Sequence, residues 1–343
     1  MKSVILMYHP RFFSPFVERV SAALGSRTIF WIQKFPRCSP VVDAFDNFSI
    51  QQLDEFFKND QAQVVRVYIF DIHLMPVIAA LRYIRKIGAS KGVVVQFFFI
   101  QHGAFADLST TRRRSFSLSW IGNSLKSFVM LLRTSSFKNI LILVELAFKS
   151  FWLGSFAVKS QLSEFIPDIR YGLFWNEEDV HVLGPDVLRR IQEVQVCEPP
   201  DREIFKLSYE KNGSVVYVAQ PLVEDGLLHR NLMDNFLVRL NEERPGLLVL
   251  LHPRSDLSIY SIFKSDQLVR ARDITHLQIS LAIGHFSSLL LSLHPSIPVE
   301  QEGFAVPLIK DSAEYIRRSR ERMLDGNMRR SFSAALIDLK NLT

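Results

Sequence analysis

Small and hydroxyl-bearing residues follow an apolar run late in the chain, and their types suit the binding of a phosphate group. Residues 276–283 read as a strand, and Gly284 stands at the end of that run. Ser287 and Ser288 come next, where a short apolar helix begins. A small residue at a strand end, followed by hydroxyls at a helix start, is a common phosphate-binding arrangement in α/β proteins. This stretch therefore predicts an anion site.

Two other apolar runs in the second half of the chain also lead into residues that could act on a phosphate or a proton. They are residues 214–219 and 247–251. The residues that follow them are Gln220, Pro221, Glu224, Asp225, His252, Pro253 and Arg254. Because ligands of open α/β sheets gather beyond the carboxyl ends of the strands, we expect these side chains to belong to one site.

One strand end in the first half of the chain carries a candidate base. Residues 93–100 lead into Gln101, His102 and Gly103, and Asp107 follows shortly after. An imidazole has an ordinary pKa close to neutrality, which suits it to accept a proton at physiological pH.

Each of these signals has an ordinary structural explanation. His252 could merely close a strand, and Ser287 could be a plain helix cap. Glu224 and Asp225 would be favourable beside the positive end of a helix dipole, and His102 could lie in a tight turn. The functional interpretation gains from their common position, because every one of these residues follows a predicted strand.

The elements that would position these residues alternate between strands and helices. In the first half we expect strands at 3–7, 27–32, 64–70 and 93–100, and helices at 12–24, 50–58 and 75–86. In the second half we expect strands at 214–219, 247–251, 276–283, 299 and 306–309, and helices within 311–340. The continuously apolar runs favour parallel sheets covered on both faces. The predicted fold is α/β, with two doubly wound, Rossmann-like domains that face a cleft.

Length and composition set the domain boundaries. A chain of 343 residues is long enough for two domains, each with its own core. Residues 198–201 (Glu-Pro-Pro-Asp) read as a linker. We therefore expect a first domain over 1–197, interrupted by a basic and apolar helical insert at about 112–160, and a second over 198–343. The two cysteines lie far apart, which excludes a disulfide framework and suits the cytoplasm.

The positive charge of the chain is concentrated in one segment. Residues 112–159 hold eight Lys and Arg against one acid, so this segment carries a charge of +7. The whole chain carries +6, so the other residues together carry −1. Aromatic and aliphatic residues are interleaved with these bases. That pattern is typical of helices that lie on an anionic membrane face, and equally of buried helices with exposed basic side chains. We expect no nucleic-acid binding, since no recognised module accompanies the charge.

A second segment passes the length test for a membrane span but fails on polarity. Residues 274–299 carry no formal charge, yet they include three histidines, two prolines and five serines. We interpret them as a buried strand, turn and helix. The amino terminus has too short an apolar run for a signal peptide.

The motifs together resemble a known group of enzymes. His252-Pro253-Arg254 after a strand, and Ser287-Ser288 about 35 residues later, are similar to motifs of the bacterial sialyltransferases and polysialyltransferases. Capsule and lipopolysaccharide transferases of the GT-B type that use CMP-activated sugars are similar too. The resemblance covers mainly residues 90–110 and 210–305. It implies that His252 and the two serines hold the phosphate of a departing CMP.

The acidic motif departs from that family pattern. Glu224-Asp225-Gly226 matches its residue types but falls in the second domain, whereas the family takes its base from the first. His102 with its glycine is instead similar to the CDP-glycerol glycerophosphotransferases, in which such a histidine is the presumed base. The base therefore remains open between His102, Asp107 and Asp225, in that order.

The resemblance implies a glycosyltransferase that moves sialic acid or a related acidic sugar from a CMP-activated donor to a glycan or polysaccharide acceptor. Direct transfer with inversion is expected, without a metal or other cofactor. The acceptor would be acidic or lipid-linked, and residues 112–159 would hold the enzyme at the inner membrane face. The alternatives are a glycerophosphotransferase that uses CDP-glycerol and a non-catalytic protein that binds acidic glycans.

Overall fold

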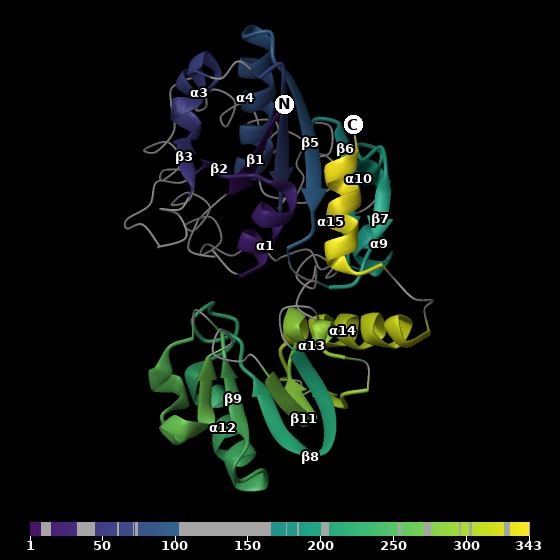
Figure 1. Ribbon diagram of the computed structural model, residues 1–343. Coiled ribbons are helices and arrows are strands. Elements are labelled where there is room, and N and C mark those ends of the chain that lie inside the picture. Colours follow the sequence, from purple (N-terminus) through teal and green to yellow (C-terminus); the bar gives the residue numbers. More distant parts are fainter. Residues whose placement is uncertain are drawn as a thin grey trace. The chain divides into compact units, whose positions relative to one another are not determined.

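The computed structural model describes residues 1–7, 15–32, 45–59, 62–70, 72, 75–102, 166–175, 177–183, 185–199, 206–252, 255–270, 276–294, 296–301, 304–325 and 330–342. These residues divide into two compact units (Figure 1). The first unit comprises 1–102, 166–197 and 333–342 of the described chain, and the second comprises 198–332. Each unit is built on one sheet of parallel strands.

The first unit has a seven-stranded sheet in the order β3-β2-β1-β4-β5-β6-β7. Every neighbouring pair is parallel. The strands are β1 (Lys2–Met7), β2 (Thr28–Trp31), β3 (Asp46–Ser49), β4 (Val64–Ile69), β5 (Val94–Ile100), β6 (Ile169–Phe174) and β7 (Val194–Val196). The chain builds the sheet outward from β1 in one direction and then returns to add β4 on its other side. The order therefore reverses between β1 and β4.

The helices of the first unit are α1 (Pro15–Leu24), α3 (Leu53–Asn59), α4 (Met75–Ser90), α9 (Glu177–Leu183), α10 (Pro185–Leu188) and α15 (Phe332–Asn341), with the 3₁₀ turn η2 (Ile50–Gln52) before α3. Phenylalanine dominates the core: Phe97, Phe98 and Phe99 of β5 are almost fully buried. Because β5 is buried on both faces, its residues are continuously apolar rather than alternating.

The second unit has a five-stranded sheet in the order β10-β9-β8-β11-β12, again with only parallel neighbours. The strands are β8 (Lys206–Val218), β9 (Leu248–Leu251), β10 (Leu268–Arg270), β11 (His276–Gly284) and β12 (Val299–Gln301). The helical elements are α12 (Arg230–Glu243), η4 (Leu257–Tyr260), η5 (Ser265–Gln267), α13 (Ser288–Ser292) and α14 (Pro307–Asp325). Here the order reverses between β8 and β11.

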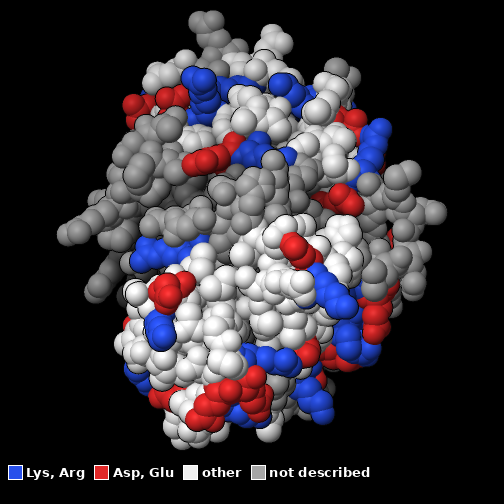
Figure 2. Space-filling model, turned by 60° about the horizontal axis from the view of Figure 1, so that its bottom comes forward, with Lys and Arg blue, Asp and Glu red and all other residues white. Residues whose placement is uncertain are grey.

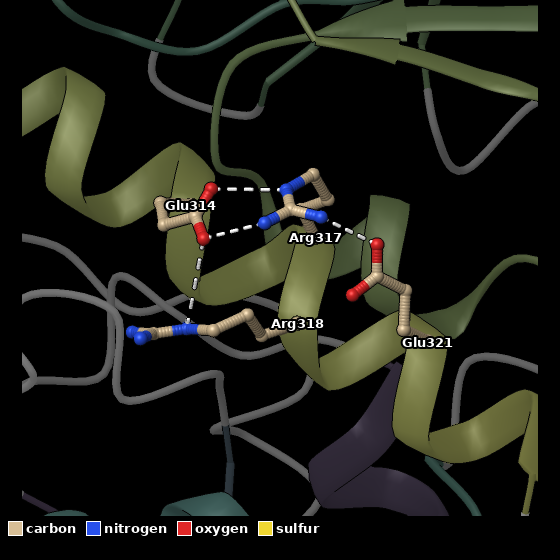
Figure 3. Close-up of polar contacts among 4 residues, drawn as sticks. All are labelled: Glu314, Arg317, Arg318 and Glu321. Carbon is tan, nitrogen blue, oxygen red and sulfur yellow. Dashed lines mark hydrogen bonds and ion pairs between the residues drawn. The ribbon is translucent and has the colours of Figure 1, made fainter.

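Helix α14 presents an ion-pair network on one face. Arg317 donates to both oxygens of Glu314, at 2.9 and 2.6 Å, and to Glu321 at 2.5 Å (Figure 3). Arg318 lies 4.0 Å from Glu314. The hydrogen bonds from Arg317 lower the pKa of the Glu314 carboxyl. These groups are exposed, so the network contributes little to stability. Its main role is to keep this face of α14 soluble, while Ile309, Tyr315 and Ile316 are buried.

The structure confirms most of the predicted elements. Each strand expected at 3–7, 27–32, 64–70, 93–100, 214–219, 247–251 and 276–283 overlaps an observed one. The segment 276–299 forms a strand, a turn and a short helix, as expected. The strand expected at 306–309 is wrong, because those residues open helix α14 with Pro307 in its first position, where a missing N–H costs nothing.

Helix α15 belongs to the first unit, although the sequence assigned all of 198–343 to the second domain. Arg19 of α1 donates to the hydroxyl of Ser333 at 2.7 Å. The buried Arg66 of β4 donates to the carbonyl oxygens of Lys340, at 3.1 Å, and Leu342. These bonds join both terminal nitrogens of the buried guanidinium to carbonyls at the end of α15. In Figure 1 the yellow α15 accordingly lies among the elements of the first unit.

Charges of both signs are interspersed on the face that Figure 2 draws. The basic segment 112–159 that carries the net positive charge lies outside the described residues, and so does the expected insert at 112–160. Among the helices that the structure describes, none combines the length and the apolar character that crossing a membrane requires.

Candidate functional site

The predicted phosphate-site residues of the second unit follow three strands that are neighbours in its sheet. Gln220 follows β8, His252 follows β9 and Ser287 follows β11. These strands are parallel and stand in the order β9-β8-β11, so their carboxyl ends lie at one edge of the sheet. The reversal of strand order between β8 and β11 makes this edge the place where an open α/β sheet binds ligands.

Gln220 ties the two central loops of this edge together. Its side chain is buried, and its Oε1 accepts a hydrogen bond from the backbone N–H of Phe286 at 2.8 Å. The bond joins the end of β8 to the turn after β11. Pro221, which is also buried, begins the loop toward α12. Gln220 therefore fixes the spacing of the two loops between which a ligand would lie.

Ser287 caps helix α13, and Gly284 lets that helix approach the sheet. The Ser287 hydroxyl accepts from the N–H of Leu289 at 3.3 Å. A Cβ on Gly284 would lie 2.9 Å from the side chain of Leu290, so a larger residue would push α13 away. Ser288 is the first residue of α13, and its side chain lies outside the described part. The small residue at the strand end thus has a packing role.

The acidic pair occupies an exposed turn between β8 and α12. Glu224 accepts a hydrogen bond from the backbone N–H of Asp256 at 2.7 Å, which joins this turn to the segment after β9. Asp225 is exposed beside Gly226, whose φ of +68° requires a glycine. Asp256 in turn caps η4 by accepting from the N–H of Ser258. The acidic-acidic-Gly motif therefore has a structural function here.

His252 is half-buried directly after β9. The backbone N–H of Ser255 donates to its carbonyl oxygen at 2.9 Å, which turns the chain sharply after the strand. Pro253 and Arg254 lie outside the described residues. The turn keeps the imidazole at the carboxyl edge of the sheet, beside the end of β8.

Sequence reasoning missed a buried histidine in the same unit. His285 is fully buried and its Nε2 lies 3.1 Å from the hydroxyl of Tyr217. The rings of Phe236 and Phe304 pack within 5.3 and 5.0 Å of the imidazole centroid. Its carbonyl accepts from Gln301 at 3.0 Å. A histidine with a polar partner in an aromatic box is a structural residue, and no sequence signal separated it from its neighbours.

Two buried tyrosines predict a loss of stability at alkaline pH. Burial raises the pKa of Tyr260 to about 12, and burial also raises the pKa of Tyr217 well above its ordinary value. Unfolded tyrosines ionise near pH 10, whereas these stay protonated in the folded chain, so stability is complete below pH 10 and falls above it. We expect Tyr260 alone to account for about 1 kcal/mol lost between pH 9 and 11. Urea unfolding should show a smaller loss in Tyr260→Phe, and the wild-type loss in the exposed control Tyr209→Phe.

In the first unit, His102 follows β5 and is exposed. Its ring meets the edge of Phe16 from α1 at 5.4 Å and lies 6.3 Å from the ring of Phe70, which follows β4. The two phenylalanine rings therefore pack against the imidazole of His102, and the rest of this side chain is exposed to solvent. Asp107 lies outside the described residues. The structure thus places His102 after the carboxyl end of β5, whereas Asp225 lies in the turn that follows the carboxyl end of β8.

A buried polar network lies immediately before His102. The Nε2 of Gln101 donates to a carboxylate oxygen of Asp179 at 2.6 Å, and its Oε1 accepts from the backbone N–H of Trp175 at 2.7 Å. Gln101 and Asp179 are both fully buried. The network joins the ends of β5 and β6 to helix α9. It fixes the backbone from which His102 projects, and sequence reasoning did not identify Asp179.

Arg320 of α14 holds the helix that Ser287 begins. Its guanidinium donates to the carbonyl oxygens of Leu290 at 2.6 Å, Leu293 at 3.3 Å and Ile297 at 3.0 Å. Replacing it with leucine should cost about 2 kcal/mol, because these carbonyls lose their donor. Thermal unfolding should show the loss in Arg320→Leu but not in Arg318→Leu, which changes an exposed side chain of the same helix. Equal unfolding temperatures would mean that water replaces the guanidinium.

Within the described ranges, no group of three or more His, Cys, Asp or Glu side chains could hold a metal ion.

Comparison with known proteins gives limited likenesses. No protein-family model matches the chain, and no curated protein does. Among solved structures, the chain is similar to an α/β-galactoside α-2,3-sialyltransferase from Photobacterium phosphoreum, with 11% identity, a TM-score of 0.42, and coverage of 93% of this chain and 98% of that one. It is also similar to the glycotransferase of kitacinnamycin, with 10% identity, a TM-score of 0.42, and coverage of 98% and 90%.

Proposed function

We propose that this protein is a glycosyltransferase whose second unit binds the nucleoside monophosphate or diphosphate part of an activated sugar. The observation that carries the proposal is the succession of Gln220, His252 and Ser287 at the carboxyl ends of three neighbouring parallel strands. The finer architecture we propose is two doubly wound, Rossmann-like domains. The strand orders support it. In each sheet the chain first adds strands on one side of its first strand and then crosses over to add the rest on the other side.

Transfer of a sugar from an activated nucleotide requires hydrogen-bond donors around the leaving phosphate. As the anomeric carbon of the sugar separates from its leaving group, negative charge grows on the phosphate oxygens. The imidazole of His252 and the hydroxyl of Ser287 are groups that can donate to such oxygens. Gln220 would serve by holding the two loops at a constant distance. Arg254 and Ser288 join the proposal on the sequence pattern alone.

We assign the base to His102. The attacking acceptor hydroxyl must lose a proton, and an exposed imidazole can take it. Its support by Phe16 and Phe70, and the anchored Gln101 beside it, limit the positions that the ring can adopt. Asp225 suits the role less, because it lies in the exposed turn whose geometry Gly226 determines.

The donor that we propose is a CMP-activated acidic sugar such as sialic acid, and the acceptor is a glycan. The motifs built on His252 and Ser287 support this assignment by their resemblance to CMP-sugar enzymes. Transfer would be direct and inverting, since no nucleophile suited to a covalent intermediate was identified at the described strand ends. Residues 112–159 would add contact with an anionic membrane or polymer.

The test is to incubate the purified protein separately with CMP-sialic acid, CMP-Kdo and CDP-glycerol and to follow CMP release. We expect release from a CMP-sugar that increases when a glycan acceptor is added. Release from CDP-glycerol alone would replace sugar transfer by glycerophosphate transfer. Calorimetric titration with CMP that gives no heat at high protein concentration, together with no turnover, would leave a non-catalytic glycan-binding protein.

A further inference from the structure

The first unit contains a second candidate ligand site, a cavity of about 450 Å³. Three of its lining residues, Arg82, Arg85 and Lys86, come from the middle and the carboxyl-terminal half of α4. Asp168 and Arg190, which precede β6 and β7, complete its polar wall. We call this cavity, with these five residues, the basic pocket.

The basic pocket lies at the opposite end of the sheet from His102. Asp168 and Arg190 stand just before their strands, so they lie at the amino ends of β6 and β7. Helix α4 runs back from the carboxyl end of β4 to the amino end of β5, and its last turns therefore reach the same end. His102 follows the carboxyl end of β5. The pocket is thus separate from the proposed base, within one unit.

The charges around the pocket are unbalanced. Four basic side chains line it against the one carboxylate of Asp168, which pairs with Arg190 at 3.4 Å. Arg82 stands three positions before Arg85 and four before Lys86. It therefore shares a helix face with each of them, and the like charges repel. Helix α4 contains no acid that could relieve this repulsion. Among the described residues, neither Arg85 nor Lys86 has an ion-pair partner.

The lining indicates the chemistry of the ligand. Guanidinium groups bind phosphate oxygens through paired hydrogen bonds, and a lysine adds a point charge. A net charge of +3 in the lining matches a multiply charged anion better than a single carboxylate. Ala89, Ile166 and Pro167 form an apolar part of the wall, and the volume falls in the range of small-molecule sites.

We propose that the basic pocket binds a phosphorylated ligand that carries at least two negative charges. The same chemistry is offered by a soluble phosphorylated metabolite and by the headgroup of an acidic phospholipid. The site is independent of the donor site in the second unit, and the proposal does not depend on the proposed function.

The first experiment titrates the full chain with inorganic pyrophosphate in a calorimeter at low salt. We expect saturable binding that weakens as salt is added. Arg85→Gln combined with Lys86→Gln should weaken it at least about tenfold, because two charge-assisted bonds are lost. Asp168→Asn should strengthen it several-fold, since the substitution removes the only lining carboxylate and releases Arg190. Circular dichroism checks that each variant is folded.

Two further arms distinguish the location and the source of the phosphate. Arg239→Gln changes an exposed basic side chain of α12 in the second unit, and it should leave the affinity for pyrophosphate at the basic pocket unchanged. Flotation with phosphatidylcholine vesicles that contain phosphatidic acid, lost in the double variant, would identify a lipid headgroup, whereas pyrophosphate binding without flotation would identify a soluble ligand. Unchanged pyrophosphate binding and flotation in the double variant, or an equal loss of pyrophosphate binding in Arg239→Gln, would overturn the proposal.

Discussion

His252→Ala is expected to lower the turnover of a CMP-sugar donor by about a hundredfold or more, with almost no change in unfolding temperature. The loss of one group that stabilises developing charge in a transition state has effects of this order. His252 is half-buried, and its turn is held by a backbone bond from Ser255, which the substitution leaves in place. The measurement is the initial rate of CMP release, with thermal unfolding recorded in parallel.

The matched control is His229→Ala. His229 is an exposed histidine of the same unit, at the start of α12, and its side chain makes no capping bond. We expect this variant to keep the wild-type rate. If His252→Ala also keeps it, the assignment of phosphate binding to His252 is wrong, and the strand-end site loses its main donor.

The largest expected effect on stability is that of Asp179→Ala, about 3 kcal/mol. The carboxylate is fully buried and accepts a 2.6 Å hydrogen bond from Gln101. Its removal leaves the amide of Gln101 buried without that acceptor, and opens a small cavity beside Trp175. Since Gln101 also holds the backbone of Trp175, the ends of β5 and β6 should loosen together. Urea unfolding should show the loss.

Glu177→Ala is the control for this prediction. Glu177 belongs to the same helix, α9, but is exposed, so its replacement should change the free energy of unfolding little. A combined variant, Asp179→Leu with Gln101→Leu, should recover only part of the lost stability, because it removes the unpaired amide of Gln101 but leaves the backbone N–H of Trp175 without that acceptor. Equal stability of Asp179→Ala and wild type would show that water satisfies Gln101.

Much of the fold could be predicted because its strands are parallel and buried. Runs such as 93–100 are continuously apolar, which distinguishes them from helices with one polar face. The short edge strands β3, β7 and β10 did not show this pattern, since β3 reads DNFS and holds its place through backbone pairing with β2. Residues 306–309 were apolar and strand-like, yet Pro307 opened a helix.

The common sheet edge of the candidate residues could be predicted, but their partners could not. Gln220, His252 and Ser287 follow strands that are neighbours in the sheet, and parallel neighbours end at the same edge. The partners of Gln220 and Glu224 depend on which loops meet in space, and that follows only from the strand order. Asp179 lies 78 residues from Gln101 in sequence, so no local pattern joined them.

The place of α15 in the first unit has a consequence for how the chain reaches its native state. During synthesis, residues 333–342 are made after the whole second unit. Arg66 in β4 therefore cannot form its hydrogen bonds to the carbonyl oxygens at the end of α15 until then. The second unit can complete its own sheet during that interval. The first unit should therefore be the later of the two to become resistant to protease when nascent chains of increasing length are compared.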